Sequence, residues 1–269
     1  MAKENTKPTR LIAGQATLLS RTMHDIRYDP IHDEFLVTNP FAQAILVFRG
    51  GANGEEAPIR IIQGPHTLLD GGGIATSGAD RLEVDPVHDE IFIPAGDRIL
   101  VYPRTANGDV APLRTIVGPD TTLKSANALA VDPVRNVIVA GTLNRYRGRM
   151  GALLTFNRTD DGNAKPRTIV VGPNTKIETL NQLQVYPPKG WIVATQSGDS
   201  YNNVEPEGVF VGIWSINDNG DVPPRWKLGG PKSVMKKPRG VALNPKNKEL
   251  IVADMRLNSV LTYYFPEIF

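Results

Sequence analysis

Short apolar segments separated by polar turns recur along almost the whole chain, with a period of roughly fifty residues. The apolar runs hold four to seven residues, are rich in Val and Ile, and are bounded by Gly, Pro, Asn and Asp; no sustained helical period is present. Asp29 to Pro65 reads DPIHDEFLVTNPFAQAILVFRGGANGEEAPIRIIQGP, and Asp85 to Pro119 reads DPVHDEIFIPAGDRILVYPRTANGDVAPLRTIVGP. Self-similarity at this period is typical of propellers and solenoids.

Each repeat ends at a glycine that an apolar strand precedes. The boundaries are Gly14, Gly64, Gly118, Gly172 and Gly230. Within each unit the pattern predicts one strand before an Asp-Pro-type turn, one after it, one near the middle of the unit and one before the next boundary. Four short antiparallel strands per unit predict a propeller blade.

The last unit contains GVALN, ELIVA and SVLTYY but lacks a fourth strand before Phe269. Residues 7–13, KPTRLIA, followed by Gly14, match the fourth-strand pattern APLRTIVG. We therefore expect the N-terminal strand to complete the C-terminal blade and close the ring. The sequence predicts an all-β, five-bladed β-propeller in a single domain, residues 1–269. Its expected blades are about 14–64, 65–118, 119–172, 173–230, and 231–269 plus 7–13.

The turns have two recurring chemistries. DPIHDE and DPVHDE place Asp and Pro where a tight turn needs a side-chain acceptor and a fixed φ. ANGEEAP, ANGDVAP, DDGNAKP and DNGDVPP place glycine beside Asn or Asp, which gives an easy φ > 0 position between two strands. His32 and His88 occupy equivalent turn positions, which favours a structural role over metal binding for both.

Composition narrows the function classes. The formal charge of the 269 residues is +2 and the basic residues are scattered, so nucleic-acid binding has no support. The absence of cysteine excludes disulfides, a thiolate nucleophile and a Cys-based zinc site. The first ten residues resemble neither a secretory signal nor a membrane span, so we expect no membrane association. The compartment is left open between the cytoplasm and a secreted or periplasmic location whose signal is absent from this sequence.

Alignment of the five units on their Asp-Pro-type turns predicts a ring of polar residues where the innermost strands begin. The position five residues before the turn is polar in every unit: His24, Asp80, Asn127, Asn181 and Arg239. The position two residues further on is apolar in every unit: Ile26, Leu82, Leu129, Leu183 and Val241. We expect the polar set to surround the mouth of the axial channel and the apolar set to pack between blades. Asparagine is also common at strand entries for purely local reasons, which is the structural alternative.

The same face should carry the longer loops, Pro65 to Asp80, Leu143 to Gly151 and Gln196 to Gly208. Elaborated loops on one face and minimal turns on the other indicate a functional loop face. A second ring, Asn39, Thr195 and Asp254, is expected just outside the first, and Asp25 is expected to support the site.

One segment carries a family resemblance. Asp254 and Asn258 in IVADMRLNSVLTY match the Asp and Asn of the NHL repeat, which an Ile/Val-rich strand follows. The chain resembles NHL-repeat and YncE-like bacterial propellers and is distantly similar to SMP-30-type lactonases. NHL propellers and the related lactonases usually have six blades, whereas this chain supplies five. The resemblance implies a propeller, but a fold alone does not give function.

Three functions are compatible with these residues. The first is binding of a small polar or anionic molecule by the axial residues. The second is metal-assisted hydrolysis of a lactone or ester, with a divalent metal (Ca, Mg, Mn or Zn) on Asp80, Asp254 and His24. The third is a protein-interaction scaffold, for which Tyr146 and Tyr201 are the obvious loop-face aromatics. Only His24 and His66 are expected on the loop face, so a three-His zinc site is not supported. No catalytic residue is assigned.

Overall fold

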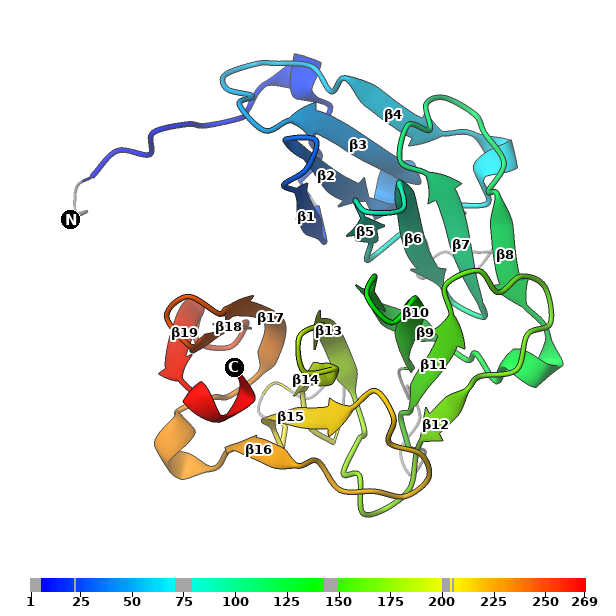
Figure 1. Ribbon diagram of the computed structural model, residues 1–269. Coiled ribbons are helices and arrows are strands. Elements are labelled where there is room, and N and C mark those ends of the chain that lie inside the picture. The colour runs from blue at the N-terminus through cyan, green and yellow to red at the C-terminus, as the bar shows by residue number, and fades with distance from the viewer. Residues whose placement is uncertain (1–5, 22, 71–78, 143–149, 200–203, 205) are drawn as a thin grey trace.

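The structure is a computed structural model that describes residues 6–21, 23–70, 79–142, 150–199, 204 and 206–269. Within these residues the strands form five antiparallel sheets that surround a central axis as blades (Figure 1). In each blade the strands follow one another in sequence order, from the axis to the rim. The predicted all-β, five-bladed propeller is confirmed.

The strand bounds follow the repeat. Blade 1 contains β1 (Ile26–Asp29), β2 (Glu34–Asn39), β3 (Ala44–Arg49) and β4 (Arg60–Gln63). Blade 2 contains β5 (Glu83–Asp85), β6 (Glu90–Ala95), β7 (Arg98–Pro103) and β8 (Arg114–Val117). Blade 3 contains β9 (Ala126–Asp132), β10 (Val137–Thr142), β11 (Leu153–Asn157) and β12 (Thr168–Val170). Blade 4 contains β13 (Leu180–Tyr186), β14 (Trp191–Gln196), β15 (Phe210–Ser215) and β16 (Trp226–Gly229). Blade 5 contains β17 (Pro238–Asn244), β18 (Glu249–Asp254) and β19 (Ser259–Tyr264).

The helical segments in the described part are single 3-10 turns. They are η1 (Gln15–Thr17), η2 (Pro40–Ala42), η3 (Pro65–Thr67), η4 (Pro119–Thr121), η5 (Pro231–Ser233) and η6 (Pro266–Ile268).

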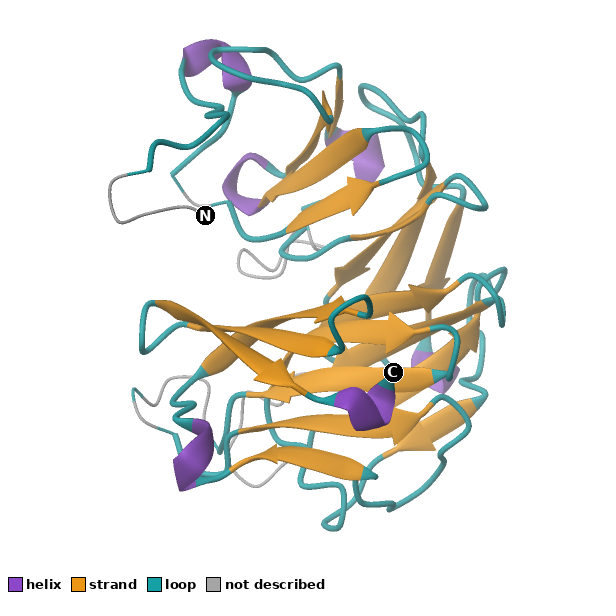
Figure 2. Ribbon diagram, turned by 60° about the vertical axis from the view of Figure 1, so that its left-hand side comes forward, coloured by secondary structure: helices purple, strands orange, loops and turns teal. Residues whose placement is uncertain are grey.

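The fifth blade differs from the expectation at one point. Its sheet has three strands, and the strand pairings of the described residues do not join residues 6–13 to β19. Instead the N-terminal segment is held by a loop of blade 1, where Gly54 N donates to Leu11 O (2.7 Å) and Ala13 N donates to Gly54 O (3.0 Å). Figures 1 and 2 show this segment on the blade 1 side of the ring, not alongside β19.

The hydrophobic core lies mainly between blades. Four of its five clusters in the described residues draw side chains from two consecutive blades, as Leu36 and Ile93 do between blades 1 and 2. Phe92 and Phe156 share the next core, and Val139 and Trp214 the one after it. A single blade has no such partner, and stacking therefore supplies the folding energy.

The Asp-Pro turns are stabilised as the sequence indicated. Asp29 Oδ1 accepts hydrogen bonds from Ile31 N (2.9 Å) and His32 N (3.0 Å), and Asp29 Oδ2 lies 2.8 Å from His32 Nδ1. Asp85 and His88 repeat the same contacts. Both histidines are therefore part of their own turns, in agreement with the structural interpretation.

The ANG-type turns do more than reverse the chain. The Asn or Asp of each turn accepts a hydrogen bond from the fourth-strand backbone of the preceding unit, which joins neighbouring units. The four contacts are Leu11 N to Asn53 Oδ1, Ile61 N to Asn107 Oδ1, Thr115 N to Asp161 Oδ1, and Ile169 N to Asn219 Oδ1, all between 2.8 and 3.0 Å. Segment 7–13 therefore makes the inter-unit contact of a fourth strand, although it lacks that strand's own sheet.

All five boundary glycines have positive φ, and at every one except Gly230 an added Cβ would also clash with a side chain of the next unit. Gly172 has φ +136°, and a Cβ added to it would lie 2.3 Å from Asp221 Cγ. Asp221 reaches this position because its Oδ1 accepts a hydrogen bond from Asn174 N (2.7 Å). Positive φ favours glycine, and the carboxylate leaves no room for a side chain.

We expect Gly172→Ala to lower the free energy of unfolding by about 2–3 kcal/mol, because it combines an unfavourable φ with a clash. The matched control is Gly108→Ala, where φ is +77° and no heavy atom lies within 4 Å of the added Cβ. That variant should lose about 1 kcal/mol. Urea unfolding of the two variants measures the difference, and equal losses would show that the Asp221 contact contributes nothing.

Candidate functional site

A cavity of about 660 Å³ lies at the axial end of the inner strands. Four of the five residues predicted to ring the channel mouth line it: His24, Asp80, Asn127 and Arg239. They come from blades 1, 2, 3 and 5, so the cavity exists only when the blades are assembled. The remaining lining residues are Met23, Arg81, Ala253, Asp254, Met255, Asn258, Ser259 and Val260.

His24 and Asp80 form an ion pair or hydrogen bond at the cavity. Nδ1 of His24 lies 2.8 Å from Asp80 Oδ1, and the side chains are 37% and 28% exposed. The imidazole also packs edge-to-face against Phe41, with 6.3 Å between the ring centroids. The carboxylate and the aromatic ring together fix the imidazole, and one ring nitrogen is held by Asp80. A histidine oriented in this way can act as a proton acceptor or donor toward a bound molecule.

Two guanidinium groups are positioned across the axis by contacts with blade 4. Arg239 Nη1 donates to Asn181 Oδ1 (2.6 Å). Arg81 Nη1 donates to the carbonyl oxygen of His24 (2.6 Å), and its Nε to the carbonyl oxygen of Asn181 (3.4 Å). Two fixed cationic groups in the lining of one cavity favour a ligand with negative charge or several acceptor oxygens.

Asn181, the fifth residue of the predicted ring, is buried and is not part of the cavity lining in the described structure. Its Nδ2 donates to Ser197 Oγ and its Oδ1 accepts from Arg239. The structure thus gives Asn181 a positioning contact to Arg239. Sequence reasoning placed both residues at one level of the axis but could not reveal that one holds the other.

The side chains of the second predicted ring, Asn39 and Thr195 in particular, make hydrogen bonds within the fold. Asn39 Oδ1 accepts from Ala42 N and Ser20 Oγ, and Thr195 Oγ1 accepts from Gln182 N; both side chains are buried. The strand registers also place Thr195 level with Thr38 and not with Asn39, since Ile26 pairs with Val37 and Leu183 with Ala194. The one-residue offset arose because the sequence gives no register between first and second strands.

Asp254 does line the cavity, but backbone groups surround its carboxylate. Oδ2 accepts from Lys236 N and Lys237 N, and Oδ1 accepts from Arg256 N and Leu257 N, at 2.8 to 3.1 Å. These contacts explain the Asp of the NHL-like segment as the residue that shapes the β18–β19 turn. Asn258, the second residue of that segment, has φ +48° and lies on the cavity wall.

Next to the cavity residues along the inner strands, a buried polar network crosses the axis. Asp25 accepts from Arg27 Nη1 (2.8 Å), Leu82 N (3.2 Å) and Gln182 Nε2 (3.3 Å). Arg27 Nε also donates to Glu83 Oε2 (3.2 Å). The network joins blades 1, 2 and 4, and burial raises the pKa of Glu83 while Arg27 opposes that rise. Asp25 lies at the centre of this network, and its predicted role in supporting the site stays a prediction.

The repeat itself contains a signal for this network, in two further aligned positions of the inner strands. The position directly after the polar ring is polar or charged in three units, with Asp25, Arg81 and Gln182. The position two residues later is charged in two units, with Arg27 and Glu83. In the structure Asp25, Arg27, Glu83 and Gln182 of these sets contact one another at the axis, whereas Arg81 lines the cavity.

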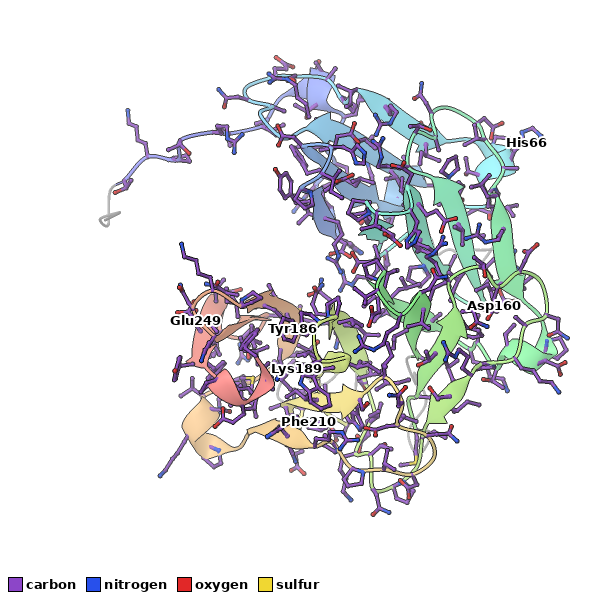
Figure 3. All side chains as sticks on the ribbon, viewed as in Figure 1. His66, Asp160, Tyr186, Lys189, Phe210 and Glu249 are labelled. Atoms are coloured by element: carbon purple, nitrogen blue, oxygen red, sulfur yellow. The ribbon has the colours of Figure 1, made fainter. Side chains whose placement is uncertain are left out.

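The predicted metal set does not assemble as a three-ligand group. Across the described ranges, no three His, Asp or Glu side chains are close enough to hold a metal ion together. His24 and Asp80 adjoin, whereas the Asp254 oxygens accept backbone hydrogen bonds. His66 lies at the outer rim of the ring (Figure 3), with its Nδ1 2.6 Å from Asp109 Oδ2. A metal at His24 and Asp80 therefore stays a prediction.

Parts of the predicted loop face lie outside the described residues. These are 71–78, 143–149, 200–203 and 205, which include Tyr146 and Tyr201. Within the described part of the chain, no helix is long and apolar enough to cross a membrane.

The fold and the cavity define a five-bladed β-propeller with a polar axial cavity. Neither a family model nor a curated protein matches the chain. The NHL resemblance therefore stays an expectation drawn from a single blade, and the function is argued from the cavity itself.

Proposed function

We propose that this propeller binds a small polar or anionic molecule in the axial cavity lined by His24, Asp80, Asn127 and Arg239. The observation that carries the proposal is the convergence of these four residues, from four blades, on one cavity of about 660 Å³. This volume lies within the range of roughly 300–1,000 Å³ that is usual for small-molecule sites.

The chemistry of the walls selects the ligand class. Arg81 and Arg239 supply fixed cationic donors, Asn127 supplies an amide, and His24 with Asp80 supplies a group that can accept or donate a proton. Among the described residues, no Phe, Tyr or Trp side chain lines the cavity. Carboxylates, phosphates and phosphorylated sugars present the oxygens that guanidinium groups recognise best.

The His24–Asp80 contact favours one second candidate, hydrolysis of a lactone or ester. Asp80 orients the imidazole, and a divalent metal bound by this pair would polarise the carbonyl group. Metal analysis of the purified protein, before and after His24→Ala and Asp80→Ala, tests this candidate. Stoichiometric metal that both substitutions remove would support it, and its absence after soaking with Ca²⁺, Mg²⁺, Mn²⁺ and Zn²⁺ would contradict it.

The binding proposal is tested by titration calorimetry with inorganic phosphate, citrate, glucose 6-phosphate and neutral glucose. We expect saturable binding of at least one of the three anions. Arg239→Gln should weaken that binding about 10-fold or more, because a charge-assisted hydrogen bond contributes about 1.5–3 kcal/mol. Asp80→Ala should also change the affinity, since it releases His24.

The matched control is Arg225→Gln. Arg225 lies just before β16 at the rim of blade 4, where its Nη2 donates to Asp218 Oδ1 (2.8 Å). This substitution removes one positive charge from the same protein and should leave the affinity unchanged. Equal weakening by both Arg substitutions, or no binding of any probe by the folded protein, would contradict the proposal.

A further inference from the structure

Two unpaired sheet edges face the seam between blade 5 and blade 1. One is β19, which has a single strand neighbour in the described structure. The other is the N-terminal segment around Ile12, which bridges to Gly54 on one side only. In native propellers the exposed edges of sheets are normally paired or covered. Here two free edges lie on either side of one seam, and each could supply the strand partner that the other lacks.

Side chains on the blade 5 wall are exposed where the other blades bury them. The strand registers make Val260 equivalent to Ile45, Ile99, Leu153 and Val211. Val260 is 67% exposed, whereas these four equivalents are 0–1% exposed. The blade 5 wall is therefore built as an interior surface.

The blade 1 wall shows the same contrast. Ile26 is 59% exposed, whereas its equivalents Leu82, Leu129, Leu183 and Val241 are 0–5% exposed. A groove of about 1,100 Å³ runs along this wall, lined by apolar side chains that include Ile12, Leu19, Ile26 and Phe35. The core cluster behind it, Val37, Ala44, Leu46, Phe48 and Ala52, draws on blade 1 and the N-terminal segment, unlike the two-blade clusters elsewhere.

The repeat also specifies which residues of the two edges would meet. In blades 1 to 3 the fourth-strand residue that bridges to the Gly of the next unit is Ile62, Ile116 or Val170. The same residues pair with Ile45, Ile99 and Leu153 of the third strand. Ile12 makes the equivalent bridge, to Gly54. Its third-strand partner is therefore Val260.

We propose that the seam closes by pairing of residues 10–13 with β19, with Ile12 opposite Val260, and that this closure completes the axial cavity. The cavity already spans the seam, because Met23 and His24 line it from blade 1 and Asn258, Ser259 and Val260 line it from blade 5. Opening admits a ligand and closing surrounds it. The link to ligand rests on the proposed function, whereas the closure itself does not.

The closing segment belongs to the same chain for a physical reason. A tethered segment meets its edge at an effective concentration of about millimolar, well above that of a second copy in dilute solution. The walls to be buried are also complementary, since each carries the apolar positions that pack together at the other four blade interfaces.

Cysteine cross-linking tests the closure, and the chain has no cysteine of its own to interfere. Directly opposed strand residues come close enough for a disulfide. We expect Ile12→Cys with Val260→Cys to form an intramolecular disulfide in most molecules under mild oxidation. The positive control is Ile45→Cys with Ile62→Cys, a pair already opposed in blade 1. The register control is Ile12→Cys with Tyr264→Cys, four residues away along β19, which should stay largely reduced.

Each outcome decides the proposal. A monomeric disulfide in the Ile12/Val260 pair alone supports closure. Disulfide-linked dimers would overturn it in favour of strand exchange between copies. No disulfide while the blade 1 control forms one, or equal reaction of the two Ile12 pairs, would also overturn it.

The coupling to ligand is measured separately with the anion that binds best in the calorimetric titration. The oxidised Ile12/Val260 variant should bind it about 10-fold more tightly than the reduced variant, because fixing the closed state removes the cost of selecting it. A disulfide that forms without any change in affinity would keep the closure and overturn the coupling. Absence of ligand binding in both forms would overturn the proposed function and leave the closure intact.

Discussion

Asp25→Ala is expected to lower the free energy of unfolding by about 3–5 kcal/mol, because it breaks a buried ion pair. Asp25 is almost fully buried and lies 2.8 Å from Arg27 Nη1. Its carboxylate also accepts from Leu82 N in blade 2 and from Gln182 Nε2 in blade 4. Removal leaves Arg27 with Glu83 as its remaining carboxylate partner and cuts the contacts that hold three blades around the axis.

Urea unfolding followed by tryptophan fluorescence measures this loss. Asp25→Asn is the matched variant, because it keeps the size and the acceptor oxygen but loses the charge, so its loss should be smaller. A cost below about 1 kcal/mol for Asp25→Ala, in the range of an exposed ion pair, would show that the network does not hold the ring together. Leu82 N, which donates to Asp25, lies two residues after Asp80 of the cavity. Asp25→Ala should therefore also weaken ligand binding.

Trp214→Ala should produce a loss of similar size, about 3–5 kcal/mol, because it leaves a large cavity in the core between blades 3 and 4. Trp214 on β15 is fully buried, and its Nε1 donates to the carbonyl oxygen of Val222 (3.3 Å). Its ring lies over Gly212, where an added Cβ would be 2.3 Å from Cη2. The labelled side chain of Phe210, from the same strand, packs beside it (Figure 3).

The Gly212 contact provides a control. Gly212→Ala alone should destabilise the protein, since its Cβ would lie 2.3 Å from the rigid indole and 2.8 Å from Phe210 Cε2. In the Trp214→Ala background the same substitution should destabilise much less, because the contact with Phe210 is the only one of the two clashes that is left. A double-mutant cycle measured by thermal unfolding tests this. Equal destabilisation by Gly212→Ala in both backgrounds would contradict the proposed packing.

Much of the architecture could be predicted from sequence because its signals are local and repeated. The boundary glycines, the Asp-Pro turns and the apolar runs each recur at fixed offsets, and together they gave the number of blades and the strand order. The polar ring was also readable, since one alignment position placed His24, Asp80, Asn127 and Arg239 at the same level of the axis.

Other features depend on contacts between units that the repeat does not encode. The alignment put Thr195 level with Asn39, but the hydrogen-bond register places it level with Thr38. It placed Asn181 in the polar ring with Arg239, but it could not show that Asn181 Oδ1 accepts a hydrogen bond from Arg239. The ANG turns appeared to be simple reversals, and their hydrogen bonds to the preceding unit became visible only in three dimensions.

The N-terminal segment separates the two kinds of information most clearly. Its sequence, TRLIAG, predicts a fourth strand, because its apolar positions and terminal glycine match those of the other units. Whether that segment lies against β19 or stands apart from it is a property of the assembled ring. The sequence by itself thus determined the blades, their order and the residues that reach the axis, since these follow from local periodicity and turn chemistry. The tertiary structure alone decided the state of the seam and the partners of the axial side chains, since both depend on how separate blades pack against one another.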